Sequence, residues 1–67
     1  MSEEEIIAAL RARAYELADT NRYADWEAIA AALAGEGEPE VLVRRLGHDG
    51  LFKIMLANRI AAAKERG

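Results

Sequence analysis

Hydrophobic positions recur along the first quarter of the chain with the period of an α-helix. At steps of ~100° per residue, six apolar side chains share an arc of about 120°: Ile6, Ile7, Leu10, Ala14, Leu17 and Ala18. Ser2 and Glu5 have the spacing of a capping box, and the acidic residues 3–5 suit the positive end of a helix dipole. The pattern predicts a helix over 3–19, ending where Asn21 can adopt a left-handed conformation.

Two shorter segments follow with the same period. Asp25 is a suitable N-cap, and apolar side chains recur at helical spacing after it, which predicts a helix over 26–34 that ends at Gly35. Pro39 fits the first position of a third helix over 39–46. Its apolar side is formed by Val41, Leu42 and Leu46. The β-branched run 41–43 would suit a strand, but the chain offers no partner strand, so a helix is favoured.

The last predicted helix, over 50–66 with Asp49 as its N-cap, is apolar on more than one side. Its apolar side chains spread further round than one core can use, and a broad arc contains Leu51, Phe52, Met55, Leu56, Ile60 and Ala63. A second apolar strip of Ile54, Ala57 and Ala61 lies elsewhere on the helix. Arg59 falls inside this arc. If the arc is core, we expect Arg59 to pair with a carboxylate such as Asp25 or Glu27 or to extend its head group to water. Otherwise this part of the face is a binding surface with Arg59 as its charged centre. A helix apolar nearly all round is central to its domain or covered by a partner.

These segments predict an all-α fold, a small bundle of three to four helices that forms a single domain over 1–67. A chain of 67 residues buries only about 60% of its unfolded surface, and alanine supplies much of its apolar content. Such small cores are commonly reinforced by disulfides, metals or self-association. Cysteine is absent, which excludes disulfides and thiolate metal sites and favours self-association.

Composition also limits the setting in which the protein acts. The acidic N-terminus, with glutamates at 3–5, lacks the basic start of a secretory signal. The longest apolar run, Ala28–Ala34, is far shorter than the ~20 residues that span a bilayer. We therefore expect a cytoplasmic protein without a membrane partner.

Charge is divided between the two halves of the chain. Residues 1–40 hold ten acidic and three basic side chains, whereas residues 41–67 hold two acidic and six basic ones. The two halves can neutralise each other within the fold, or their opposite potentials can orient a partner.

Residues able to perform catalysis or bind metal are few. The single histidine, His48, stands beside Asp49 in a predicted turn, and no second strong ligand accompanies it. The glycines at 35 and 37 lack the remainder of a phosphate-binding fingerprint. We therefore expect a non-catalytic protein with no cofactor, no metal site and no small-molecule substrate.

One segment resembles a known DNA-binding motif. Residues 25–46, with Asp25–Ala30, Leu33, Gly35 and Val41–Leu46, resemble the helix-turn-helix core of small DNA-binding regulators. The resemblance implies DNA contacts from Arg44, Arg45 and Lys53. Against this interpretation, the reading helix would open with Glu38-Pro39-Glu40, which brings carboxylates towards phosphates. DNA binding is therefore the alternative function.

A second resemblance points to origin rather than mechanism. Residues 21–29, with the Tyr23-x-x-Trp26-x-x-Ile29 corner, and the restart Gly37-Glu38-Pro39-Glu40 are similar to a pattern in short, uncharacterised bacterial or phage helical proteins. Our main expectation is a small regulatory or protein-interaction module that binds a protein partner or a second copy of itself. The predicted contact residues are Arg44, Arg45, Ile54, Ala57, Arg59 and Ala61.

Overall fold

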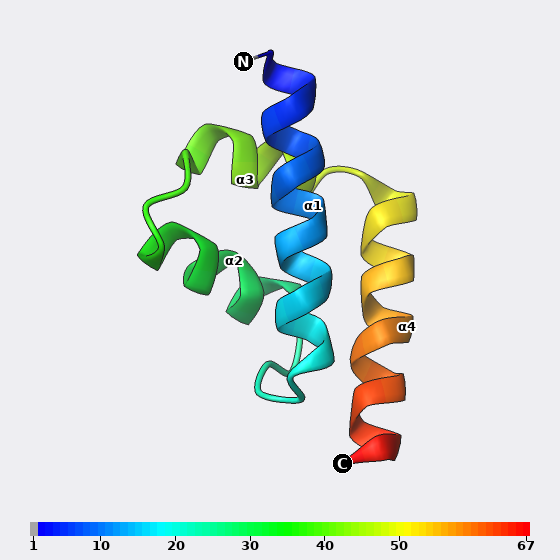
Figure 1. The fold of residues 1–67 in the computed structure, drawn as a ribbon. Helices are drawn as coiled ribbons and strands as arrows, with labels where there is room; N and C mark the ends of the chain where they lie inside the picture. Colours follow the sequence, from blue (N-terminus) through cyan, green and yellow to red (C-terminus); the bar gives the residue numbers. More distant parts are fainter. Residues whose placement is uncertain (1) are drawn as a thin grey trace.

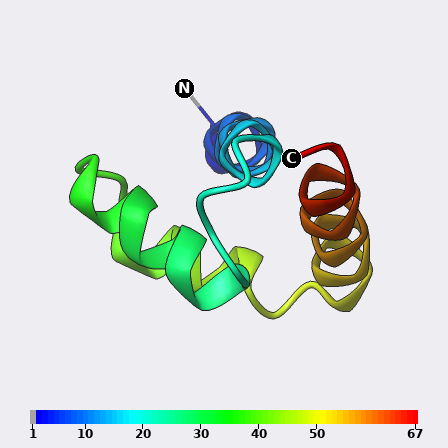
Figure 2. The same ribbon diagram turned by 90° about the horizontal axis from the view of Figure 1, so that it is seen from below.

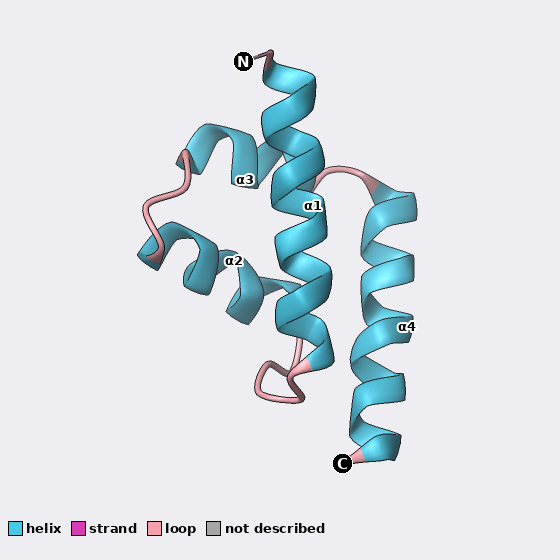
Figure 3. Cartoon of the chain, in the orientation of Figure 1, coloured by secondary structure: helices cyan, strands magenta, loops and turns pink. Residues whose placement is uncertain are grey.

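The computed structural model describes residues 2–67, which form four helices: α1 (Glu3–Asp19), α2 (Trp26–Gly35), α3 (Glu40–Leu46) and α4 (Gly50–Arg66). α1 and α4 lie side by side and run in the same direction (Figure 1). Viewed along α1, the hairpin of α2 and α3 lies to one side and α4 to the other (Figure 2). The described residues between the helices are loops and turns, without a strand (Figure 3). The predicted all-α bundle is confirmed.

Three of the helices begin at the side-chain caps predicted from the sequence. The Ser2 hydroxyl accepts a hydrogen bond from the Glu5 N–H at 3.2 Å. The Asp25 carboxylate accepts from the N–H of the third residue of α2 at 3.0 Å, and the Asp49 carboxylate accepts from the Phe52 N–H at 3.1 Å. Each cap satisfies an N–H that the helix itself leaves without a partner.

The end of α2 lies slightly later than predicted. Gly35 is still helical, and the residue with positive φ (89°) is Gly37. The Gly37 N–H donates to the Ala34 carbonyl at 3.0 Å and the Glu38 N–H to the Leu33 carbonyl at 3.2 Å. This pair of bonds is the Schellman motif, whose left-handed residue is most readily glycine. The prediction that Gly35 ends the helix was therefore wrong, because Gly35 is still helical and Gly37 is the left-handed residue. Asn21 does adopt the predicted left-handed conformation, at φ 61°.

α3 also differs in detail from the prediction. Pro39 is the N-cap, with extended backbone angles, and the helix starts at Glu40. Val41 was expected on the apolar side but is exposed, whereas Val43 and Leu46 are buried. The later start of α3 does not change which residues share a face of the helix. Val41 is exposed because the face that contains Val43 and Leu46 is the one that packs against α1 and α2.

All four helices contribute to one hydrophobic core. Its buried members are Leu10, Ala14, Leu17, Ala18, Ile29, Leu33, Val43, Leu46, Phe52, Leu56 and Ile60. The face of α1 predicted from the periodicity supplies the first four, with Ile6 and Ile7 half-buried against them. The amphipathic reading of α1 is therefore confirmed.

Phe52 lies at the centre of an aromatic group that ties α4 to α1 and α2. Its ring centroid is 5.5 Å from that of Tyr15 and 5.4 Å from that of Trp26, the latter in an edge-to-face arrangement. Trp26 also lies against the backbone of Gly47, where an added Cβ would come within 2.6 Å of the indole nitrogen. This close approach fixes the first turn of α2 between α4 and the turn that precedes it.

α4 exposes part of its broad apolar arc. Phe52, Leu56 and Ile60 are buried, but Leu51 and Met55 remain 69% and 49% exposed. α4 lies at the edge of the bundle, with α1 and the first turn of α2 as its main neighbours, so only a narrow face is covered. The apolar side chains of α4 thus spread further round the helix than the core covers, as the sequence indicated.

Candidate protein-binding surface

A groove of about 430 Å³ lies between the N-terminal part of α2 and the length of α4. We call it the α2–α4 groove. Leu56 and Ile60 line its floor and Trp26 one wall, while Ala57 and Ala61 line the α4 side. α2 leads away from α4 after its first turn (Figure 2), and no other helix covers this side of α4. The small alanine side chains leave the hollow open.

The two edges of the α2–α4 groove carry opposite charges. Lys53 and Lys64 line the α4 edge, and Asp25 and Glu27 the α2 edge. Within residues 2–67, neither lysine lies in an ion pair, and Asp25 is engaged as the cap of α2. The lysines are eleven residues apart, which places them on one side of α4 about 16 Å from each other. The α4 edge thus offers two free cations at a fixed separation.

The outer side of α4 carries an exposed apolar stripe next to the groove. Leu51, Ile54 and Met55 are large exposed hydrophobic residues, and Ile54 is 62% exposed. Ala62 continues the stripe at helical spacing, whereas the polar Asn58 interrupts it, and both are exposed. Val41 on α3 is the other large hydrophobic residue exposed in the described chain, so three of four such residues cluster on one helix.

The structure brings together three of the six predicted contact residues. Ala57 and Ala61 line the groove, and Ile54 is exposed one turn away on the same helix. The other three are cations that form ion pairs within the fold. Arg44 pairs with Glu40 at 3.6 Å, Arg45 pairs with Glu3, and Arg59 pairs with Asp19 at 3.9 Å.

Arg59 has different neighbours from those expected. Its guanidinium lies 4.5 Å from the centroid of the Tyr15 ring and pairs with Asp19, rather than with Asp25 or Glu27. α1 runs beside α4 in the same direction (Figure 1). Asp19, the last residue of α1, therefore lies level with Arg59. Arg59 is therefore paired with a carboxylate as expected, but the partner is Asp19. Its cation–π contact with Tyr15 adds a structural role.

The residues of the DNA-binding alternative line two hollows, each of which also contains carboxylates. Arg44 and Lys53 line a second hollow, together with Glu27 and Glu40. Arg45 lines a different hollow, beside Asp49. Carboxylates beside each cation oppose the approach of phosphates, because backbone binding depends on several cations acting on one surface.

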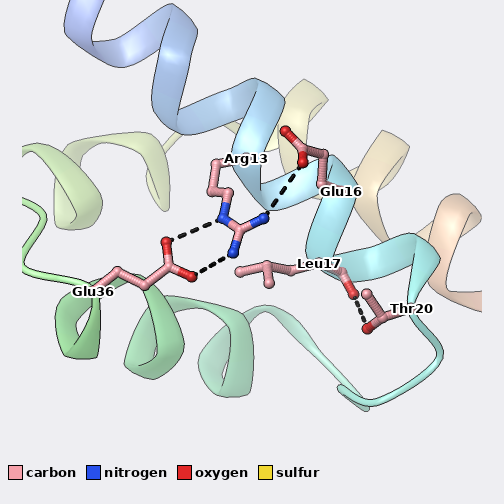
Figure 4. A network of polar contacts seen from close by, with 5 residues as sticks. All are labelled: Arg13, Glu16, Leu17, Thr20 and Glu36. Atoms are coloured by element: carbon pink, nitrogen blue, oxygen red, sulfur yellow. Dashed lines mark hydrogen bonds and ion pairs between the residues drawn. The ribbon is translucent and has the colours of Figure 1, made fainter.

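A salt-bridge network on the other side of the bundle fixes α2 relative to α1 (Figure 4). The Arg13 guanidinium donates to both carboxylate oxygens of Glu36, at 3.1 and 2.8 Å, and to Glu16 at 3.4 Å. These hydrogen bonds and the positive charge of Arg13 hold the pKa of Glu36 below its ordinary value. The network holds the C-terminal end of α2 at α1, while Trp26 holds its N-terminal end at α4.

Sequence reasoning did not identify Trp26, Leu56, Ile60 or Lys64 as lining a binding surface. Leu56 and Ile60 lie in the broad apolar arc of the predicted helix, and both are buried. The sequence does show the spacing of Lys53, Ala57 and Lys64, which places one lysine on each side of an alanine on the same helix face.

Further searches of the described chain add two findings. Residues 2–67 contain no group of three His, Asp or Glu side chains arranged to hold a metal ion. None of the four helices combines the length and apolar composition needed to cross a bilayer. Comparison of the chain with family models, curated proteins and solved structures gave no significant match.

Proposed function

We propose that this chain is a small non-catalytic protein-interaction module whose α2–α4 groove receives a helix of a protein partner. The observation that carries the proposal is an apolar groove of about 430 Å³ flanked by two lysines that form no ion pair in the described chain. Helix-in-groove binding is a recurring mode of recognition in which an apolar helix face enters a hydrophobic groove and charges at the rim fix its orientation.

The alanines of the groove favour a helical partner. Ala57 and Ala61 project little from α4, so a second helix can approach its axis closely, towards the short end of the 8–10 Å range. Trp26 offers a half-buried aromatic surface at the wall of the groove, and aromatic residues often contribute much of the binding energy of an interface. The exposed Ile54 extends the apolar contact beyond the groove.

Charge favours a partner helix with carboxylates on one edge. Lys53 and Lys64 are exposed, and neither is neutralised within the described fold. Two acidic side chains about three turns apart would meet both lysines at once. Asp25 and Glu27 at the opposite edge oppose this preference, so the carboxylates of the partner must lie at the α4 edge. Their negative charge is partly offset, because both stand at the positive end of the α2 dipole.

The proposal is tested by titrating the protein with helical peptides and following the fluorescence of Trp26, the only tryptophan. An alanine-rich helical peptide with glutamates eleven residues apart should change the emission, and the same peptide with lysines should not. Ala57→Glu should abolish the response. Ala62→Glu, which adds the same charge to an exposed position on the outer side of α4, should leave it intact. Emission that responds to neither peptide at millimolar concentration would contradict the proposal.

A further inference from the structure

We infer that the helix occupying the α2–α4 groove is α1 of a second copy of this chain, so that copies associate head to tail. This inference rests on the proposed function and names the partner. It is carried by a match between two exposed helix faces that lie on different sides of the same molecule.

The first of these faces is the outer side of α1, away from the core. Glu5, Ala9, Ala12 and Glu16 are all exposed and follow one another at intervals of four, three and four residues. At ~100° per residue they lie within about 60° of one another on the helix. We call this set the α1 outer face. It has no side chain larger than alanine between its two carboxylates.

The two faces match in spacing and in charge. Glu5 and Glu16 are eleven residues apart, as are Lys53 and Lys64. In both helices the charged residues flank two exposed alanines, which on α4 are Ala57 and Ala61. When the alanines of one helix lie against those of the other, each glutamate reaches a lysine at the same level, whichever direction the helix runs.

The glutamates of the α1 outer face are available for this contact. Glu5 has no ion pair among the described residues. The pair of Glu16 with Arg13 is long, at 3.4 Å, and the Glu16 side chain is 67% exposed. Arg13 makes its shorter bonds to Glu36, so Glu16 can meet a lysine without releasing the network that holds α2.

The arrangement of the two faces makes the contact heterologous. The α1 outer face is exposed and lies opposite the buried face of α1, whereas the groove is lined by residues of α2 and α4. A copy whose groove is occupied still exposes its own α1 outer face, which a further copy can bind. The assemblies should therefore lengthen as the protein concentration rises. A symmetric pairing of two grooves would instead bring the lysines of both copies together, which like-charge repulsion disfavours.

The test measures mass against protein concentration by sedimentation equilibrium, from about 10 μM to 1 mM. The natural chain should form assemblies that grow beyond the dimer. Their association should weaken as the salt concentration rises, because salt screens the ion pairs. Glu5→Lys should weaken association about tenfold or more, because it places a lysine against Lys53 or Lys64. Glu4→Lys is the matched control, since it makes the same charge change in the same turn on a different side of α1. Equal effects of these two substitutions would overturn the inference.

A mixing experiment tests the head-to-tail geometry. Ala12→Glu blocks the α1 outer face and Ala57→Glu blocks the groove, so each variant alone should remain a monomer. Their mixture keeps one intact face of each kind and should form a 1:1 dimer that grows no further. A mixture that stays monomeric would overturn the inference, as would a natural chain that stops at a dimer.

The peptide titration separates the two proposals. If the natural chain is a monomer at every concentration but the acidic peptide still changes Trp26 emission, the second copy is not the occupant and the interaction module stands. If neither association nor a peptide response is seen, both proposals fail. Circular dichroism of each variant confirms that the helices are retained.

Discussion

Substitution of Gly47 by alanine should destabilise the protein through Trp26. A Cβ at Gly47 would lie 2.6 Å from the indole nitrogen and 3.2 Å from the adjacent ring carbon. The backbone of Gly47 has φ −66° and ψ −14°, which alanine adopts without strain. The loss therefore comes from the collision, which must exceed the small backbone gain that alanine brings at a helical φ and ψ. Movement of the indole would disturb its edge-to-face packing on Phe52, whose ring centroid lies 5.4 Å away.

The expected size follows from the cost of overpacking. Adding a methyl group to a filled site typically costs about 1–3 kcal/mol. In a domain of this size, each kcal/mol changes the Tm by roughly 4–8 °C. We therefore expect Gly47→Ala to lower the Tm by on the order of 10 °C. Displacement of Trp26 should also weaken peptide binding at the α2–α4 groove, since this side chain forms one of its walls.

Thermal unfolding followed by circular dichroism provides the assay, and Gly35→Ala is the matched control. Gly35 is helical and nothing lies within 4 Å of its added Cβ, so this substitution should stabilise by about 0.5–1 kcal/mol. Trp26→Phe in the Gly47→Ala background should recover part of the loss, which a double-mutant cycle measures. A Gly47→Ala protein as stable as the natural chain would refute the packing described here.

Three further substitutions test the core, a cap and an ion pair. Leu10→Ala, at a side chain 1% exposed, should cost about 2–5 kcal/mol in denaturant unfolding; a smaller loss would contradict its place in the core. Asp49→Ala should cost about 0.5–2 kcal/mol and fray the start of α4 in amide exchange, and unchanged exchange would contradict the cap. The pKa of Glu36 is lowered in the folded state, so its pair with Arg13 stabilises above the ordinary value of 4.5 and is lost as pH falls through the folded pKa. Glu36→Gln should therefore show a smaller loss of stability on acidification than the natural chain, and an unchanged acid dependence would contradict the pair.

The helix boundaries were predictable because the signals that set them are local. Ser2, Asp25 and Asp49 each accept a hydrogen bond from the N–H three residues ahead, within the same short segment. The left-handed residue after α1, Asn21, is equally local. The error at the end of α2 arose because two glycines stand two residues apart, and the sequence alone does not show which one carries the positive φ.

The face that each helix buries was less predictable, because it depends on neighbours. Periodicity shows that Leu51 and Met55 are apolar and lie beside Phe52 on the helical wheel, but not that α4 has only α1 and the first turn of α2 to pack against. The same limit applies to the groove. Ala57 and Ala61 could be identified on α4, whereas its other wall comes from Trp26, thirty-one residues earlier in the chain.

The division of charge between the two halves of the chain has two separate consequences in the fold. Some pairs join the halves within one molecule: Glu3 with Arg45, Asp19 with Arg59, and Arg11 with Asp49 at 4.0 Å. These pairs all use arginine, whose planar group suits fixed ion pairs.

The two lysines of the chain follow a different pattern. Lys53 and Lys64 form no ion pair among residues 2–67, and both line the same groove. Internal neutralisation therefore accounts for most of the arginines but not for the lysines. The uncompensated charge of the lysines favours carboxylates at the α4 edge of the groove, although Asp25 and Glu27 oppose them at the α2 edge. The α1 outer face supplies two carboxylates at the same separation as the lysines.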